Sequence, residues 1–195
     1  WCQRTIQDQA SKQFNEQLWD TDNPYLWKSS NPVFKENCPI IIYEAHIGMS
    51  SEQEAVSSYK EFTAEVLPRI AKGGYNTIQL MAIQEHPYYG SFGYHVSNFF
   101  AASSRFGTPE ELKELIDTAH GLGLIIIMDL VHSHAVKNIM EGPGLFDGVP
   151  GMFFHKDERR EHPAWDSLCF DYSKNETIHF LLSNCKYWIE EYHFD

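Results

Sequence analysis

One apolar run that leads directly into an acidic side chain constrains this fold the most. Residues 124–128 read Leu-Ile-Ile-Ile-Met, Asp129 follows them, and His134 comes five residues later. An apolar run without alternation is typical of a parallel strand buried on both faces. In α/β enzymes, polar residues after such a strand lie at the carboxyl edge of the sheet, where the chemistry takes place. The run therefore predicts an α/β protein with a site beside Asp129 and His134.

The same alternation of strand and helix recurs along the chain. Strands are expected at residues 39–44, 77–82 and 124–130. A Ser-x-x-Glu capping box predicts a helix start at Ser51, and the run Thr-Pro-Glu-Glu predicts another at Thr108. A third helix opens near Ser173 and is expected to bury Ile178, Leu181, Leu182, Cys185, Trp188, Ile189 and Tyr192. Such units form a parallel sheet, either a (β/α)₈ barrel or an open doubly wound sheet, although no Gly-rich phosphate loop is seen.

The chain divides into two parts. Residues 1–38 are polar, with turn signals and scattered aromatics, and we interpret them as the end of a preceding module and a linker whose aromatics pack on the neighbouring domain. Residues 39–195 hold the strand–helix units. Two connections there, 83–107 and 135–172, follow the second and third strands and are longer than a turn requires. Loops on that face commonly carry function.

Composition limits the classes of partner. The net charge of −12 makes nucleic acid or an anionic membrane an unfavourable partner, and no apolar segment is long enough to span a bilayer. The four cysteines are widely spaced and form no C-x-x-C pair. That spacing is typical of free thiols, so we expect a cytoplasmic protein without a metal or other cofactor. The first residue is Trp1 rather than Met, which suggests that further residues precede it.

Candidate ligand-binding residues lie in the first long connection and after the third strand. Residues 84–94 gather aromatic rings with polar tips, and Tyr94, between a glycine and a histidine, is the strongest candidate for stacking on a sugar. The alternative is that these rings fill a small core beneath the loop. His132 and His134 also resemble the H-x-H metal pair of amidohydrolase barrels, but no further ligands stand at an obvious strand end.

Several stretches closely resemble the eukaryotic-type 1,4-α-glucan (glycogen or starch) branching enzymes of the α-amylase superfamily. The main ones are residues 99–112, FFAASSRFGTPEEL, and 129–135, DLVHSHA. Ser133 stands before the histidine where amylases usually carry Asn, which points to branching enzymes. The family's W-D-S-R-L-F-N-Y stretch appears as WDSLCFDY at residues 165–172. Further matches are residues 43–48, 75–81, 89–94 and 180–184.

The resemblance implies a partial (β/α)₈ barrel, preceded by the tail of an all-β carbohydrate-binding module at residues 1–38. By the same resemblance, Asp129 orders the site, His134 binds the sugar at the cleavage point and Tyr94 stacks under it. Glu176 matches a peripheral glucan contact at a helix start. His179 stands where the family commonly has Arg.

The resemblance also implies a retaining mechanism, in which one carboxylate attacks the anomeric carbon and a second carboxyl protonates the leaving oxygen. The glucosyl-enzyme is then offered to a glucan 6-hydroxyl, which makes an α-1,6 branch in glycogen biosynthesis. Phe194 and Asp195 match only the start of the family's F-D-G-F-R-F-D-G nucleophile stretch. We therefore expect no catalytic residue in this chain, and a binding wall for α-1,4-glucan. The alternatives are a non-catalytic glucan-binding protein, another α-amylase-superfamily hydrolase or, remotely, the amidohydrolase barrel.

Overall fold

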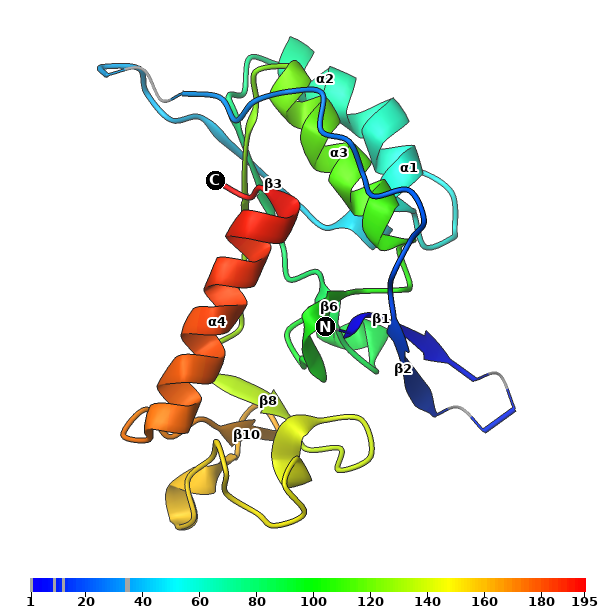
Figure 1. Ribbon diagram of the computed structural model, residues 1–195. Helices are drawn as coiled ribbons and strands as arrows, with labels where there is room; N and C mark the ends of the chain where they lie inside the picture. Colours follow the sequence, from blue (N-terminus) through cyan, green and yellow to red (C-terminus); the bar gives the residue numbers. More distant parts are fainter. Residues whose placement is uncertain (1, 9, 12, 34–35) are drawn as a thin grey trace.

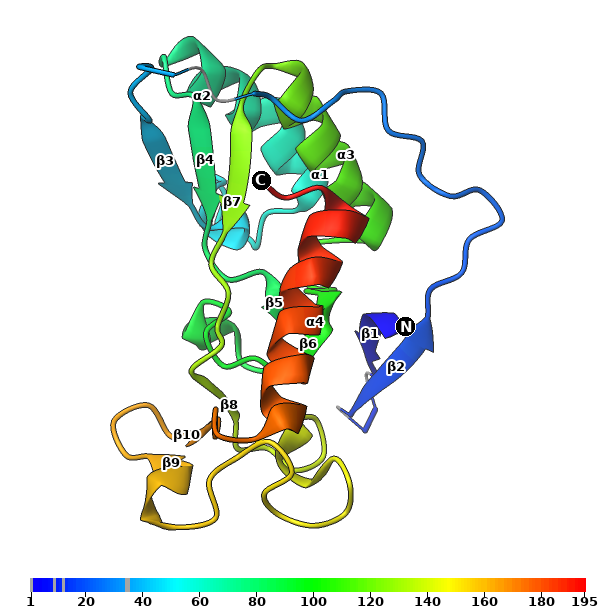
Figure 2. The same ribbon diagram turned by 60° about the vertical axis from the view of Figure 1, so that its left-hand side comes forward.

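Three parallel strands form the central sheet in the computed structural model. β3 (Ile42–Ala45), β4 (Thr77–Leu80) and β7 (Ile125–Met128) lie in the order β3-β4-β7. Figure 2 shows their arrows running in the same direction, with both long connections beyond the arrowheads. The predicted parallel sheet is confirmed. The structure describes residues 2–8, 10–11, 13–33 and 36–195, so Trp1 lies outside the described residues.

The first strand begins later than its apolar run predicts. Asn76 explains the difference, because before Ile42 its side chain takes the place of the backbone hydrogen bonds between neighbouring strands. The Ile41 backbone N–H donates to Asn76 Oδ1 over 2.8 Å, and Asn76 Nδ2 donates to the carbonyl of Pro39 over 2.8 Å. The segment from Pro39 to Ile41 is thus extended and held in place, but it is not yet part of the sheet.

Helices cover one face of the sheet (Figures 1 and 2). One continuous helical segment comprises α1 (Tyr59–Glu61), the π-helical turn η2 (Phe62–Val66) and α2 (Leu67–Lys72). Pro68 stands at the start of α2, where its missing N–H favours an irregular turn before it. α3 (Pro109–Gly121) packs beside this segment. We call the sheet with α1, η2, α2 and α3 the framework.

The first of these helices begins at Ser58, so the predicted start at Ser51 is wrong. Residues 58–61 repeat the Ser-x-x-Glu pattern, and there the capping box is formed: Glu61 N donates to Ser58 Oγ and Ser58 N donates to Glu61 Oε2. A tertiary contact decides between the two sites, because Tyr59 N donates to the carbonyl of Phe106 over 2.8 Å. The box predicted at Thr108 is confirmed.

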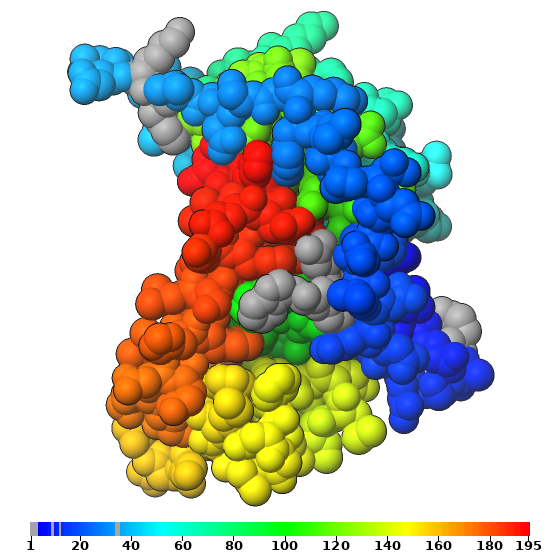
Figure 3. Space-filling model, in the orientation of Figure 1, coloured from blue at the N-terminus to red at the C-terminus, as the bar shows by residue number. Residues whose placement is uncertain are grey.

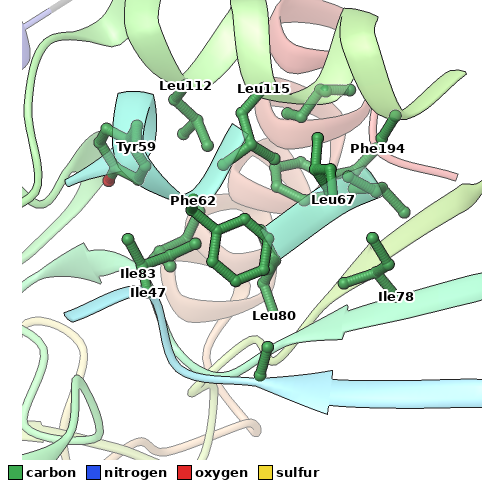
Figure 4. Close-up of a cluster of buried hydrophobic side chains, with 14 of the residues drawn as sticks. Ile47, Tyr59, Phe62, Leu67, Ile78, Leu80, Ile83, Leu112, Leu115 and Phe194 are labelled. Atoms are coloured by element: carbon green, nitrogen blue, oxygen red, sulfur yellow. The ribbon is translucent and has the colours of Figure 1, made fainter. Parts of the chain in front are cut away.

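The main core lies between the sheet and the framework helices (Figure 4). Its side chains come from all the framework elements and have almost no exposed surface. Phe62 from η2 and Leu80 from β4 meet at its centre, and Leu115 of α3 closes it from above. Burial of these periodic apolar faces is the main stabilising term for such a layer.

The two long connections are themselves folded, and we call residues 83–107 and 135–172 the loop layer. The first contains the antiparallel pair β5 (Gln84–Glu85) and β6 (Asn98–Ala102) and the turn η3 (Tyr89–Ser91). The second contains most of a three-stranded antiparallel sheet and two short helical turns. These are β8 (His134–Val136), β9 (Glu161–His162), β10 (Ser167–Cys169), η4 (Pro143–Leu145) and η5 (Glu158–Arg160).

A second core supports the loop layer, but Tyr88 and Phe92 from residues 84–94 are exposed and do not fill it, and Tyr94 packs against it partly buried. Phe154 stacks on Phe170 with ring centroids 4.8 Å apart, and Phe99 contacts the same ring edge-on. Leu181 of α4 (Asn175–Tyr192) also belongs to it. α4 runs from the loop layer back to the framework (Figure 1). The long connections are therefore packed structures and not open coils.

Only part of the predicted inner face of α4 is buried. Leu181, Trp188 and Tyr192 are buried as expected, with the Trp188 indole donating to the carbonyl of Phe99 over 3.1 Å. In contrast, Ile178, Leu182 and Ile189 are exposed. The helix is apolar on more than one face, and periodicity does not tell which face meets a neighbour. Among the described residues, no helix has the length and apolarity needed to cross a membrane.

The N-terminal segment packs against the rest of the chain. β1 (Cys2–Gln7) and β2 (Phe14–Leu18) form an antiparallel pair, and an extended stretch follows. Figure 3 shows this segment in blue beside the red end of α4. Trp19 Nε1 donates to the Glu110 carboxylate at 2.6 Å, and the Trp27 ring stacks on His193 at 3.9 Å. These aromatics contact the neighbouring helices, as predicted.

Candidate functional site

A pocket of about 600 Å³ opens at the carboxyl edge of the sheet. It lies where the end of β7 meets the loop layer, so residues distant in sequence share its wall. Three of the predicted site residues, Tyr94, Asp129 and His134, line it. The other lining residues are Ser91, His95, Met128, Leu130, Val131, Ser133 and Trp165.

Asp129 stands at the centre of a hydrogen-bond network. The Tyr94 hydroxyl donates to Asp129 Oδ2 over 2.6 Å, and Gln79 Nε2 donates to Oδ1 over 2.8 Å. The backbone N–H of Asp129 continues the ladder to the carbonyl of Leu80. Because both carboxylate oxygens are fixed by neighbours, the side chain has one orientation while its remaining lone pairs can still accept bonds from a ligand.

A tight turn places the Tyr94 ring over the strand ends. Phe92 has φ 53° and Gly93 has φ 91°, both in the left-handed region. A Cβ on Gly93 would lie 1.9 Å from the carbonyl oxygen of Ala82, so only glycine fits there. The turn thus docks on the end of β4, and the next residue, Tyr94, reaches Asp129.

His134 joins the same network through its ring. Its Nε2 lies 2.9 Å from the carbonyl of Tyr94, and its Nδ1 lies 2.8 Å from Ser133 Oγ. A carbonyl accepts only, so the neutral ring donates from Nε2 and accepts the Ser133 hydroxyl at Nδ1. Both nitrogens are occupied by protein groups. In this arrangement His134 supports the Tyr94 backbone, and a bond to a sugar requires one nitrogen to change partner.

Burial keeps the Tyr94 hydroxyl protonated and favours the uncharged form of the His134 ring. Burial, together with the hydrogen bond to Asp129, raises the pKa of the Tyr94 phenol well above its usual range, so the hydroxyl stays a donor at neutral pH. Burial lowers the pKa of His134 below its ordinary value, although its bond to the Tyr94 carbonyl opposes the shift. The pocket therefore offers hydrogen-bond partners to a neutral polar ligand.

The remaining two predicted site residues lie elsewhere. Glu176 stands in the first turn of α4 and His179 at its fifth residue; both are exposed, and neither lines the pocket. The exposed start of α4 is not part of the pocket at the end of β7, so a glucan contact at these two residues would belong to a separate surface.

The H-x-H pair does not converge as a metal site would require. His132 Nε2 lies 2.9 Å from Asn184 Oδ1, whereas His134 contacts Tyr94 and Ser133. Regular alternation would place residues 132 and 134 on one face, but the chain bends at Ser133 before β8 begins, so the two rings have different surroundings. In the described part of the chain, no group of three or more His, Cys, Asp or Glu side chains is arranged to hold a metal ion.

The site includes two residues to which the sequence analysis gave no role. Gln79 is a polar residue between Ile78 and Leu80 in the strand β4, which is the only signal that the sequence offers. Trp165 reaches the pocket from the turn between β9 and β10. Its stretch was recognised as a family motif, but nothing in the sequence shows that this turn folds back to Asp129.

The fold and the similarity to a known family define the class of protein to which this chain belongs. Residues 63–141 match the alpha-amylase catalytic-domain family. The structure superimposes on that of a maltogenic alpha-amylase from Thermotoga neapolitana with a TM-score of 0.64 and 28% identity, covering 80% of this chain and 37% of the other. The chain therefore belongs to the alpha-amylase superfamily and contains part of its barrel.

Within that superfamily the sequence is homologous to the 1,4-alpha-glucan-branching enzymes. The enzyme of Yarrowia lipolytica is 52% identical over 198 aligned residues, which cover 100% of this chain and 28% of the relative. The enzyme of Equus caballus is 50% identical, again over 100% of this chain and 28% of its own length. The chain thus spans under a third of the length of these branching enzymes.

Proposed function

We propose that residues 1–195 form the substrate-binding wall of a 1,4-α-glucan branching enzyme, which cleaves an α-1,4-glucan such as glycogen or starch and transfers the cut chain to a 6-hydroxyl. The single observation that carries the proposal is the Tyr94–Asp129–His134 network around one pocket. Identity of about 50% to branching enzymes along the whole chain supports it.

Each side chain has a role suited to its surroundings. The Asp129 carboxylate accepts from sugar hydroxyls and holds the Tyr94 ring, which offers a flat apolar surface to the CH face of a pyranose. Neutral His134 keeps the Tyr94 backbone in place. These groups bind and orient one glucose unit, which is what positions its anomeric carbon for attack.

The two carboxyl groups that carry out the reaction are proposed to lie in the part of the enzyme outside residues 1–195. Phe194 and Asp195 match only the beginning of the family's nucleophile stretch, and Asp195 has another task. It accepts from the Ile126 backbone at 2.8 Å and contacts His120 at 3.0 Å. This carboxylate is engaged between α3 and β7, away from the pocket lining.

Two further parts of the proposal concern context. We propose that residues 1–38 are the end of an all-β carbohydrate-binding module with its linker, which the paired strands β1 and β2 support. We also propose the cytoplasm as its compartment, in keeping with the free thiols of Cys38, Cys169 and Cys185.

The proposal is tested on the complete protein encoded by the transcript that contains this chain. Incubation with amylose should lower the iodine absorbance and create α-1,6 linkages without a matching rise in reducing ends. Purified residues 1–195 should show neither change. A rise in reducing ends without branching would identify a hydrolase instead, and glucan binding without any turnover would identify a non-catalytic binding protein.

A further inference from the structure

We propose that Trp165 is a stacking platform for a second glucose unit, next to the unit held by Tyr94, Asp129 and His134. This inference rests on the proposed function and adds a residue that determines how the glucan chain is gripped. Trp165 lines the same pocket, and its ring centroid lies 5.2 Å from that of His134.

The exposure of the indole is the first argument. Trp165 is 53% exposed, although it stands beside a largely buried histidine at the rim of a pocket. Large aromatic rings contribute most when they are desolvated, so an open indole facing a pocket is typical of a binding surface. The pocket volume of about 600 Å³ lies in the range of sites for ligands larger than a monosaccharide.

The turn that carries the indole is built to hold it. Trp165 N donates to the carbonyl of His162 over 3.3 Å, and Asp166 adopts the left-handed conformation with φ 45°. Asp is among the few residues other than glycine that adopt this conformation readily, so it suits a tight turn. Lys137 of the adjoining segment connects to this turn through ion pairs with Glu161 at 2.9 Å and Asp166 at 2.7 Å.

One face of the ring is already covered. The His162 imidazole lies parallel to the indole, with centroids 4.1 Å apart and planes 8° from parallel. This stacking fixes the ring plane, so that a ligand meets a preorganised surface and loses less entropy on binding. Tyr94 and Trp165 come from different connections and present two rings in one pocket, and a linear glucan presents successive CH faces to such rings.

The test uses the complete protein and the variants Trp165→Ala and Trp165→Phe. Phe146→Ala is the matched control, because Phe146 lies exposed in the same connection and does not line the pocket. The measurements are the Kd for maltoheptaose, from affinity electrophoresis, and kcat and KM with amylose. We expect Trp165→Ala to raise Kd and KM about tenfold, with a much smaller change in kcat. Trp165→Phe should recover most of the affinity, and Phe146→Ala should leave both constants unchanged.

Different outcomes overturn different statements. If Trp165→Ala matches Phe146→Ala while the wild type branches amylose, the platform is wrong and the proposed function stands. A loss of kcat at unchanged KM would also contradict stacking of a glucose unit on Trp165, since it would mean that Trp165 acts by holding His134 in position. If the wild type is not slowed by glucan in affinity electrophoresis and does not turn over amylose, the proposed function fails and the inference fails with it.

Discussion

The framework and the loop layer differ in where their apolar side chains end up. In the framework, the helix-facing side is fully buried, but Ile40, Ile41 and Ile42 at the β3 edge of the sheet are 56%, 46% and 45% exposed. The loop layer contains short antiparallel pairs around its own core, and its exposed ring at the pocket is Trp165. Both parts thus expose apolar side chains, but in the framework three of them follow one another along one edge of the sheet, and the pocket lies at the junction of the two parts.

The largest expected effect concerns the framework as a whole. Because a row of isoleucines stands exposed beside an unpaired edge of β3, we expect residues 1–195 expressed alone to aggregate or to bind apolar dyes strongly. The variant Ile41→Lys should reduce the aggregated fraction, whereas a lysine at the exposed Val149 of the loop layer should not. A soluble monomer with sharp melting and dispersed amide signals would contradict this view of the framework.

The next prediction asks whether the loop layer is a true core. Phe154 is fully buried against Phe170, so Phe154→Ala should cost about 3–5 kcal/mol of local stability. Hydrogen exchange of the β10 amides in the complete protein measures that cost. Phe146→Ala, at an exposed position, should cost less than about 0.5 kcal/mol. Equal exchange rates in the two variants would mean that residues 135–172 do not form a cooperatively packed core.

A smaller effect is expected at the junction. Asp129→Asn keeps the shape of the side chain but removes the charge that receives the Tyr94 hydroxyl and the Gln79 amide. We expect kcat of the complete protein to fall about a hundredfold, with the circular dichroism spectrum unchanged. The control is Asp147→Asn, an exposed aspartate in the loop layer, and it should have wild-type kcat. Full activity in Asp129→Asn would separate the pocket from the reaction.

The smallest effect is a dependence on pH. Burial lowers the pKa of His134 in the folded state, so protons bind more readily to the unfolded chain at mildly acidic pH. The stability from this group is complete above the ordinary histidine pKa of about 6.5 and is lost as pH falls from there toward the lowered value. The melting temperature should drop by about 2 °C more in the wild type than in His134→Asn between pH 7 and pH 5.5. Parallel curves would show that His134 is not desolvated.

Local patterns predicted the order of elements well. The run before Asp129 and the capping box at Thr108 each depend on neighbours within a few residues, and both were confirmed. The start at Ser51 failed because the same four-residue pattern recurs at Ser58, where a bond between Tyr59 and Phe106 decides. The prediction that Ile178, Leu182 and Ile189 of α4 are buried was wrong, because the helix is apolar on more than one face and periodicity does not tell which face meets a neighbour.

For the site, the sequence by itself determined which residue types stand at the strand ends. The nearness of Asp129 and His134 follows from their spacing after a strand, and Gly93 fixes the turn that delivers Tyr94. Only the tertiary structure decided that Gln79 shares Asp129 and that Trp165 reaches the pocket, while Glu176 and His179 do not. The physical reason is range: backbone preference and alternation act over a few residues, whereas contacts across 50 residues between Gln79 and Asp129 depend on how layers pack.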